Sequence, residues 1–365
     1  MNKKIRAIGA GILAAVWLGL CAFAWLQPAK ERSDSERRKL AQLPKLTAQA
    51  LLDGSYMEKF ADYAVDQFPL RDSFRSLKAL FQQNVLLQKD NNGYFVYDGY
   101  LVKQTYPLNE ASVNHAVSVM RSLYQAYLAD TGCNLYLSVV PDKGYYVQGY
   151  PSMDYAVLQT RLEQDLSWAD MIDISDTLEL SDYYRTDTHW RQEKLMETAA
   201  ALCQAMGVEA PRQQNFTQTK VSDSFYGVYY GHAAVPMEPE ELYLMHSELL
   251  RGCTLTDLST GKQLPLYDES KLGGADMYEV YLSGNQPLLK LENPNATTDR
   301  ELVIFRDSFG SAIAPLLMSG YRSITLVDVR YVSAQMIGSY VTFDSQDVLF
   351  LYSTLVLNES ATLRK

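Results

Sequence analysis

The sequence has 365 residues, which is enough for one large domain or two ordinary ones. Its 33 basic and 43 acidic residues give a net charge of −10. Three of the basic residues, Lys3, Lys4 and Arg6, lie in the first six positions, so the remainder holds 30 basic and 43 acidic residues, a net charge of −13. A body this acidic lacks the basic surface that nucleic acid or anionic lipid requires, and we expect no nucleic-acid partner.

An uncharged run from Ala7 to Leu26 follows these basic residues and has about the roughly 20 residues needed to cross a bilayer. Because the positive charges precede it, residues 1–6 are expected in the cytoplasm and everything after Pro28 outside. The alternative is a cleaved signal peptide, since Ala22-Phe23-Ala24 fits a cleavage site. Residues 1–27 are thus a single-pass cell-membrane anchor or a signal, and the C-terminal part is extracytoplasmic, or secreted after cleavage.

The cysteines and histidines give no sign of a metal or cofactor. Besides Cys21 the chain has Cys133, Cys203 and Cys253, with no CxxC pair. Export would allow one disulfide among these three, and the sequence does not choose the pair. The four histidines lie far apart, so we expect neither a metal site nor a cofactor.

The segment before the main domain is expected to be a tether followed by helices. Residues 28–46 are charged and have few large apolar side chains, as is typical of a linker. Residues 47–90 show helical spacing, with Phe74, Leu77, Phe81 and Val85 on one face after a break at Phe68-Pro69. We expect this face to pack against the main domain; a stripe that binds a cofactor or partner is the alternative.

Residues 91–365 alternate between apolar strand-like runs and helical patterns. Such alternation predicts an α/β domain with a mainly parallel sheet covered by helices on both faces. The expected strands are 93–97, 135–140, 171–174, 302–305, 324–327 and 348–352, with helices around 113–127, 191–205 and 310–319. Residues 213–298 break this rhythm and are rich in tyrosine and glycine, which predicts an insertion of loops and short strands.

Two short motifs carry the parts of an acyl-transfer triad. Tyr184–Trp190 places Asp187 two residues before His189, so on an extended segment both side chains would face the same side. Phe305–Gly310 places Ser308 where an apolar run breaks into a turn. An acid that orients an imidazole, which in turn deprotonates a serine, is the arrangement used for acyl transfer.

Each motif alone also has an ordinary explanation. An Asp-x-His pair fits a surface pair or two metal ligands, and a serine at a strand end often caps the next helix. The same position also suits catalysis, because N–H groups at a helix N-terminus can stabilise an oxyanion and because sites in open α/β sheets lie at the carboxyl ends of strands. The two motifs together therefore predict a triad of Asp187, His189 and Ser308.

The chain resembles the DHHW family of bacterial exported proteins and the related SGNH-hydrolase-like domain of periplasmic alginate O-acetyltransferases. The resemblance extends to near Ser353 and is carried by Glu36–Ala41, Phe68–Asp72, Val140–Lys143, Tyr184–Trp190, Arg306–Phe309 and Asp328–Tyr331. It implies an SGNH-hydrolase-like fold. In the acetyltransferases an Asp-x-His pair and a later Asp-Ser dipeptide form the triad; the pair matches Asp187 and His189, and the serine of the dipeptide matches Ser308. The chain departs from the DHHW name at Thr188, where the acetyltransferases often have threonine, and from the hydrolase serine motif at Arg306, where glycine is usual.

Four further residues are candidates for binding substrate. Trp190 would stack on a sugar or pack beneath the site. Arg330 would bind an anionic group or pair with Asp328 or Asp307, and Lys143, after Pro141, has the same two alternatives. Arg306 directly precedes the Asp-Ser dipeptide and is the fourth candidate.

The resemblance implies an exported O-acyltransferase that transfers acetyl groups to a cell-envelope or secreted polysaccharide through a serine acyl-enzyme. It also implies a multi-pass membrane acyltransferase as the upstream acyl donor. Two alternatives remain: a carbohydrate esterase with the same triad, in which water is the acceptor, and a non-catalytic envelope scaffold or glycan-binding protein.

Overall fold

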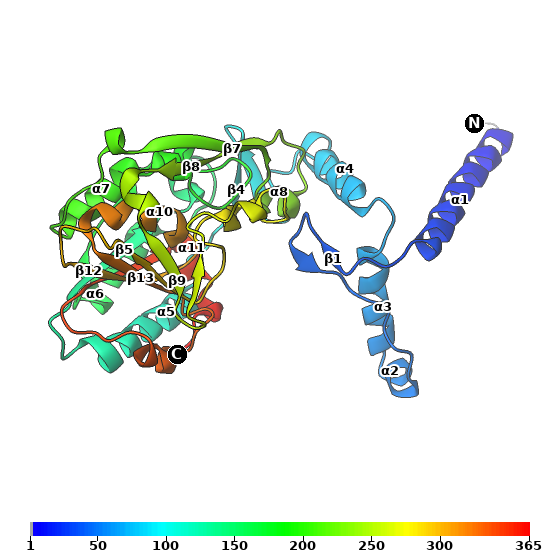
Figure 1. Ribbon diagram of the computed structural model, residues 1–365. Helices are drawn as coiled ribbons and strands as arrows, with labels where there is room; N and C mark the ends of the chain where they lie inside the picture. The colour runs from blue at the N-terminus through cyan, green and yellow to red at the C-terminus, as the bar shows by residue number, and fades with distance from the viewer. Residues whose placement is uncertain (1–2) are drawn as a thin grey trace. The chain divides into compact units, whose positions relative to one another are not determined.

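The computed structural model describes residues 3–365 and divides into two compact units (Figure 1). The first contains the residues up to Asn92 together with Tyr230–Pro236. The second contains Gly93–Tyr229 and Met237–Lys365. Both sequence motifs, around His189 and around Ser308, therefore lie in the second unit.

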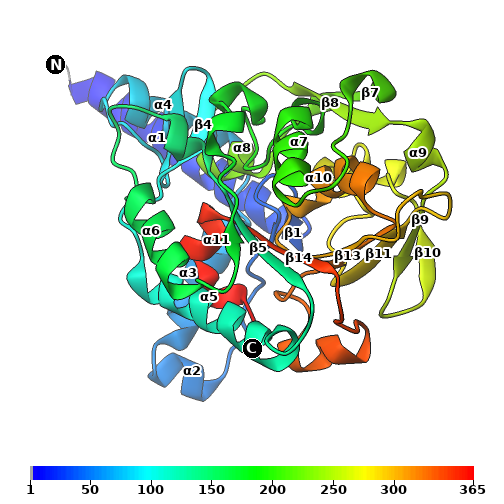
Figure 2. The ribbon, with the colours of Figure 1, turned by 90° about the vertical axis from the view of Figure 1, so that its left-hand side faces the viewer.

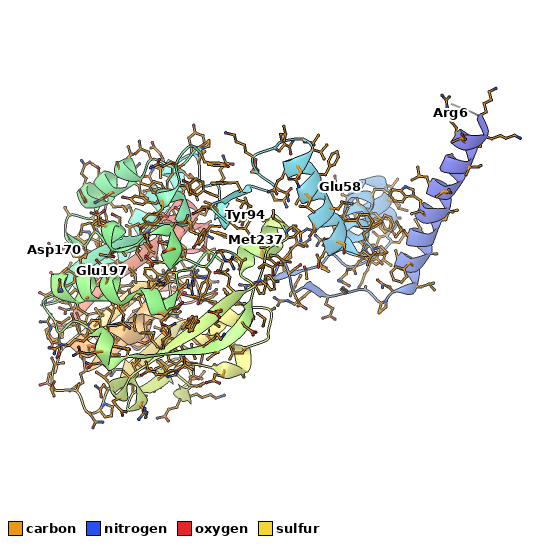
Figure 3. All side chains as sticks on the ribbon, turned by 90° about the horizontal axis from the view of Figure 1, so that it is seen from above. Arg6, Glu58, Tyr94, Asp170, Glu197 and Met237 are labelled. Atoms are coloured by element: carbon orange, nitrogen blue, oxygen red, sulfur yellow. The ribbon has the colours of Figure 1, made fainter. Side chains whose placement is uncertain are left out.

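The first unit begins with α1 (Lys3–Leu26), a helix long and apolar enough to cross a membrane, although a signal sequence passes the same test. Most of its described side chains are exposed, and Arg6 lies near its start (Figure 3). After it come a small antiparallel pair, β1 (Arg32–Ser33) and β2 (Arg38–Lys39), and then α2 (Ala48–Leu52), α3 (Ser55–Asp66) and α4 (Arg71–Asn84). Helices thus form within residues 47–90.

Ion pairs hold β1, β2, α3 and α4 together. Arg38 donates to both carboxylate oxygens of Asp66, at 2.8 and 2.5 Å. Glu36 pairs with Arg71 at 2.5 Å and with Arg75 at 3.2 Å. The residues expected to form a tether therefore include a folded hairpin that is fixed to the helices.

The second unit is built on an eight-stranded sheet of order β10-β9-β11-β13-β12-β14-β5-β6. The four pairs from β13 to β6 are parallel, and the three from β10 to β13 are antiparallel. The strands are β5 (Asn134–Val140), β6 (Asp170–Met171), β9 (Thr254–Asp257), β10 (Lys262–Leu264), β11 (Leu288–Glu292), β12 (Glu301–Arg306), β13 (Ser323–Val327) and β14 (Asp347–Ser353). This mostly parallel α/β sheet confirms the predicted fold class.

Helices cover both faces of the sheet, because its strands are apolar on both sides. Leu302 and Ile304 pack in one cluster with α7 (Met196–Ala205) and α10 (Gly310–Leu317). Val303 and Phe305 face the other way and pack with α5 (Glu110–Leu123) and α6 (Tyr155–Asp165). Figure 2 shows α7 and α10 on one side of the sheet and α5 on the other.

The segment 213–298 is integrated with the sheet. It supplies β9, β10 and β11, which extend the sheet on its antiparallel side. It also forms the bulged hairpin of β7 (Thr217–Phe225) and β8 (Glu240–His246), the short α9 (Glu248–Arg251) and the 3-10 turn η8 (Met277–Val280).

The remaining elements are short. They are the hairpin β3 (Tyr94–Tyr97) and β4 (Tyr100–Lys103), the π-helical turn Tyr124–Leu128 that continues α5, α8 (Val228–Ala233), α11 (Thr354–Asn358), and 3-10 turns that include η2 (Lys143–Tyr146). The predicted strand at 171–174 is shorter than expected, because regular pairing with β5 stops at Met171. All four cysteines are free thiols.

Candidate active site

Ser308 lies in the turn between β12 and α10, at the carboxyl end of a central parallel strand. The buried Asp307 fixes this turn, since its carboxylate accepts the N–H of Phe309 at 2.9 Å and the N–H of Ser353, at the end of β14, at 2.8 Å. A Cβ on Gly310 would lie 2.8 Å from the Cβ of Arg306, so the start of α10 approaches the strand too closely for a side chain there. Ser308 itself is half-buried.

The structure brings Asp187, His189 and Ser308 together. His189 Nε2 lies 2.8 Å from Ser308 Oγ, and His189 Nδ1 lies 2.5 Å from Asp187 Oδ1. Asp187 is fully buried, and its Oδ2 accepts the N–H of Val228 at 2.7 Å. Both contacts of the imidazole are within hydrogen-bond reach, and the carboxylate is held on both of its oxygens.

The loop that carries Asp187 and His189 is bent rather than extended, which corrects the expectation from the sequence. The His189 N–H donates back to Asp187 Oδ1 at 3.0 Å, and the Tyr184 N–H donates to the His189 carbonyl at 3.0 Å, closing the loop. The acid and the base face one nucleophile because this turn folds them together.

Two buried charged residues satisfy the backbone of this loop. Glu240, at the start of β8, accepts the N–H groups of Arg185 and Thr186 at 2.6 and 2.7 Å. Lys143 donates from Nζ to the carbonyls of Tyr184 and Arg185 at 2.9 and 3.3 Å. Burial lowers the pKa of Lys143 to about 7. Lys143 therefore supports the loop from beneath and does not contact the solvent side where a substrate would bind.

Close packing against Asp187 requires glycine at position 227. A Cβ there would lie 2.1 Å from the Asp187 Cβ. The Gly227 N–H donates to Thr186 Oγ1 at 3.0 Å, and Tyr229 donates to Thr188 Oγ1 at 3.0 Å. Thr186 and Thr188, the two neighbours of Asp187, are thus hydrogen-bonded by Gly227 and Tyr229.

Two aromatic rings enclose the imidazole of His189. Tyr278 of η8 stacks on it with ring centroids 3.8 Å apart and planes 7° apart. Phe309 lies against it at 5.0 Å. Tyr278 is buried, and burial raises its pKa well above 10. Its hydroxyl has no hydrogen-bond partner within the part of the chain that the structure describes. The sequence did not single out Tyr278. It is one of the 26 tyrosines of the chain, and it lies far from both motifs without a local pattern of its own.

The N–H groups at the start of α10 are only partly available for an oxyanion. Those of Phe309 and Gly310 donate to Asp307, and that of Ser311 donates to the Ser308 carbonyl. Among the described residues 3–365, the Ser308 N–H has no acceptor. It is the group of this turn that is placed to bind a negatively charged oxygen.

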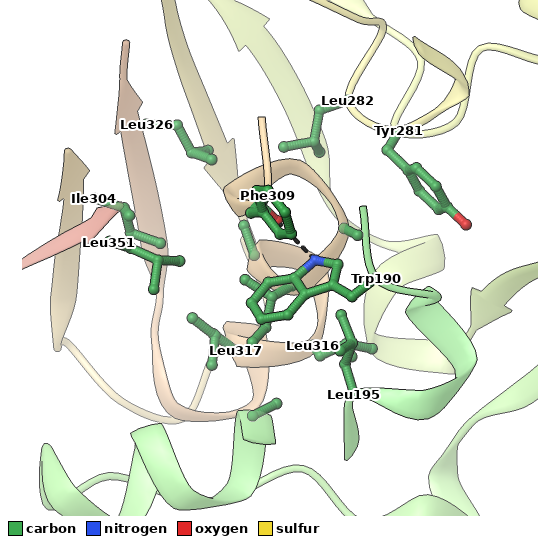
Figure 4. Packing of buried hydrophobic residues seen from close by; sticks show 14 of the residues in the cluster. Trp190, Leu195, Tyr281, Leu282, Ile304, Phe309, Leu316, Leu317, Leu326 and Leu351 are labelled. Atoms are coloured by element: carbon green, nitrogen blue, oxygen red, sulfur yellow. Dashed lines mark hydrogen bonds between the residues drawn. The ribbon is translucent and has the colours of Figure 1, made fainter. Parts of the chain in front are cut away.

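Three of the four predicted substrate-binding residues are in the protein interior. Trp190 is fully buried and donates from Nε1 to the Phe309 carbonyl at 3.1 Å, so it packs beneath the site (Figure 4). Arg306 is also fully buried and donates to Ser311 Oγ at 3.1 Å, with Asp328 at 3.7 Å. Like Lys143, these residues are buried and hydrogen-bonded within the protein, so the structure has Trp190 in the packing role that was one of its two predicted alternatives.

Arg330 follows β13, the strand beside β12, and forms the ion pair that was one of its two predicted alternatives. Its Nε and Nη2 donate to the two carboxylate oxygens of Asp328 at 2.9 and 2.6 Å. Asp328 is fully buried and also lies near Arg306, so it is shared between two guanidinium groups.

Comparison with known proteins identifies the fold. No family model matches the sequence, and no curated protein matches it significantly. Among solved structures, a DHHW family protein from Eubacterium siraeum is similar at 20% identity and a TM-score of 0.61, covering 76% of this chain and 97% of that one. Two structures of Bacillus cereus PatB1 are also similar. The one with a sulfonyl adduct has 16% identity and a TM-score of 0.59, covering 72% of this chain and 95% of that one. The one without the adduct has 18% identity and a TM-score of 0.52, covering 72% of this chain and 96% of that one.

These similarities place the chain in a structural class. It has the SGNH-hydrolase-like α/β architecture that the sequence resemblance predicted, with an apolar N-terminal helix. Within that class its fold is shared with a DHHW family protein and with PatB1, which confirms the predicted relationship at the level of fold.

Proposed function

We propose that this chain is an exported, membrane-anchored O-acyltransferase that transfers acetyl groups to hydroxyls of a cell-envelope or secreted polysaccharide. The observation that carries the proposal is the continuous hydrogen-bonded chain from Asp187 through His189 to Ser308. Its position at the carboxyl end of β12 supports the proposal, since sites in open α/β sheets lie at that edge. α1 serves as the anchor, with residues 1–6 on the cytoplasmic side.

The first half-reaction acetylates the serine. His189 Nε2 takes the proton of Ser308 as Oγ attacks the acetyl carbonyl of the donor, and the Ser308 N–H stabilises the oxyanion. The C–O bond to the donor then breaks, the protonated imidazole gives its proton to the leaving oxygen, and acetyl-Ser308 remains. Asp187 keeps the proton on Nδ1 and stabilises the imidazolium.

The second half-reaction passes the acetyl group on. A sugar hydroxyl loses its proton to His189 Nε2 and attacks acetyl-Ser308, and the proton returns to Ser308 Oγ as the ester bond breaks. Outside the cytoplasm there is no ready supply of acetyl-CoA, so the donor is supplied by a multi-pass membrane acyltransferase. Water in place of the sugar would make the same site an esterase.

The test uses a covalent probe and a competition between acceptors. A sulfonyl fluoride, chosen because PatB1 has been seen with a sulfonyl adduct, should label Ser308 in the unmodified protein and not in Ser308→Ala. An activated acetyl ester is then incubated with candidate oligosaccharides, followed by mass spectrometry. Acetylated sugar supports the transferase, free acetate alone indicates the esterase, and absence of both labelling and turnover indicates a scaffold or glycan-binding protein.

A further inference from the structure

A row of exposed apolar side chains runs along α4 and its two ends. Leu70, Phe74, Leu77, Phe81 and Val85 recur every three or four residues, so they lie on one side of the helix. We call these five residues the α4 stripe. Their exposed fractions range from 42 to 64%, whereas Ala79 on the other side of the helix is fully buried.

The first unit exposes other apolar side chains besides the α4 stripe. Further exposed hydrophobic side chains in the same unit are Leu43, Leu46, Leu51, Leu52, Met57, Val65, Leu80, Leu86 and Leu87. Single exposed apolar residues are ordinary, but a contiguous row on a helix marks a surface that contacts a partner or a membrane. The helical pattern of residues 47–90 predicted that this face packs against the main domain.

Aromatic contacts connect the α4 stripe to the apolar helix α1. Trp17 in α1 lies against Phe68 with ring centroids 6.4 Å apart. Phe68 in turn lies against Phe74, the second residue of the stripe, at 5.5 Å. The stripe therefore continues an apolar surface that begins on the helix long enough to span a bilayer.

The charge of the chain is divided in the same way. Residues 28–92 hold 11 basic and 9 acidic residues, whereas residues 93–365 hold 19 basic and 34 acidic ones. The strongly acidic character that argues against anionic lipid thus belongs to the later part of the chain. Lys78 borders the stripe and is exposed, which places a positive charge where lipid phosphates would lie.

We propose that α4 lies flat on the outer surface of the bilayer that α1 crosses, with the α4 stripe inserted among the lipid headgroups and upper acyl chains. The proposal rests on α1 remaining as a membrane anchor, as in the proposed function. An amphipathic helix with one apolar side and basic residues at its border binds a membrane interface in this orientation. It fixes the first unit to the membrane at a second point beyond α1.

The test places a probe on either side of α4 in the full-length protein. In a background with Cys21, Cys133, Cys203 and Cys253 replaced by alanine, Leu77→Cys and, separately, Asp72→Cys carry an environment-sensitive fluorophore. Asp72 is a matched control: its side chain is 65% exposed and lies about 140° from Leu77 around the helix. The protein is reconstituted in phosphatidylethanolamine–phosphatidylglycerol vesicles with or without acyl chains brominated near the headgroup.

The expected result is a blue-shifted probe at position 77 that brominated lipid quenches at least about twofold, with little quenching at position 72. A water-exposed probe at position 77 overturns the proposal. So does a blue-shifted probe that brominated lipid does not quench, because the stripe is then covered by protein, either the rest of the chain or a second copy. Retention in the vesicles after an alkaline carbonate wash reports on the α1 anchor separately, so failure of the anchor is distinguished from failure of the stripe.

Discussion

In the second unit the side chains of β12 alternate between two apolar clusters, and nearly every member of those clusters is fully buried. In the first unit, the buried hydrophobic residues among the described side chains are few and mostly small: Leu40, Ala79, Ala233, Ala234 and Val235. The first unit is held mainly by ion pairs between the β1–β2 hairpin, α3 and α4. Most of its large apolar side chains are exposed.

This difference separates two uses of apolar surface. In the second unit, buried apolar surface fixes the candidate site, because the segments that carry Asp187, His189 and Ser308 are packed and hydrogen-bonded from several elements. In the first unit much of the apolar surface is exposed, and the proposal above assigns it to contact with the membrane. Substitutions of triad residues or of buried apolar residues in the second unit should therefore affect chemistry or folding, and substitutions of exposed apolar residues in the first should affect neither.

The largest effect is expected at Ser308, where chemistry should be lost without loss of fold. Ser308→Ala should abolish sulfonyl labelling and reduce acetyl transfer by on the order of 10⁴-fold or more. The melting temperature should change little, because a half-buried hydroxyl in a turn contributes little packing. Ser311→Ala, which removes a hydroxyl one turn further along α10, is the control and should still be labelled at Ser308. Unchanged turnover in Ser308→Ala would exclude the proposed mechanism.

The next largest effect concerns the stability of the fold, tested by replacing one leucine in each unit with alanine. Leu202 in α7 is fully buried, and Leu202→Ala should lower the free energy of unfolding of the second unit by about 2–5 kcal/mol, through lost burial and a residual cavity. Leu77 in α4 is 61% exposed, and Leu77→Ala should change the stability in lipid-free detergent solution by less than about 0.5 kcal/mol. Chemical denaturation of the two variants measures both. Similar costs would mean that the α4 stripe is packed in the folded chain.

The sequence predicted those parts of the site that depend on local signals. An apolar run followed by Asp-Ser and then a helical pattern located Ser308, and the spacing of Asp187 and His189 suggested a shared target. The supporting residues come from remote positions: Glu240 from β8, Gly227 from just before α8, Val228 from the start of α8, and Tyr278 from η8. Nothing local distinguishes them, because their roles arise only when the chain folds.

The same limit applies to the residues beside the motifs and to the segment 213–298. Trp190, Lys143 and Arg306 flank the motifs, so proximity in sequence suggested that they face a substrate. Adjacent residues on a strand or bent loop point in different directions, and these three point into the interior. The segment 213–298 was expected to hold loops and short strands, but its place in the central sheet was not, because β11 pairs with the distant β13 and β9 pairs with β11. Pairing between distant strands is not encoded in the local pattern.

A moderate effect is expected at Tyr278, whose ring covers His189. Tyr278→Ala should lower kcat about tenfold or less with KM little changed, since stacking is worth about 0.5–1.5 kcal/mol and orients the imidazole without contacting the acceptor. Tyr278→Phe is the matched control, and it should retain full activity because the Tyr278 hydroxyl has no hydrogen-bond partner. Steady-state kinetics with an activated ester provides both constants. A loss in Tyr278→Phe equal to that in Tyr278→Ala would show that the hydroxyl, and not the ring, is needed.

The smallest effect concerns the ion pairs of the first unit. The hydrogen bonds from Arg38 lower the pKa of Asp66 from 3.8 to about 2. Because the folded-state value is the lower one, the pair stabilises the first unit above about pH 4, and this contribution is lost as the pH falls from about 4 to 2. Asp66→Asn should reproduce the loss at neutral pH, at about 1 kcal/mol or less because the Arg38 side chain is 41% exposed and screened by solvent. Hydrogen exchange should therefore speed up in β1, β2 and the end of α3 but stay unchanged in β12 and β14. Faster exchange in those two central strands would mean that the second unit depends on the first for its stability.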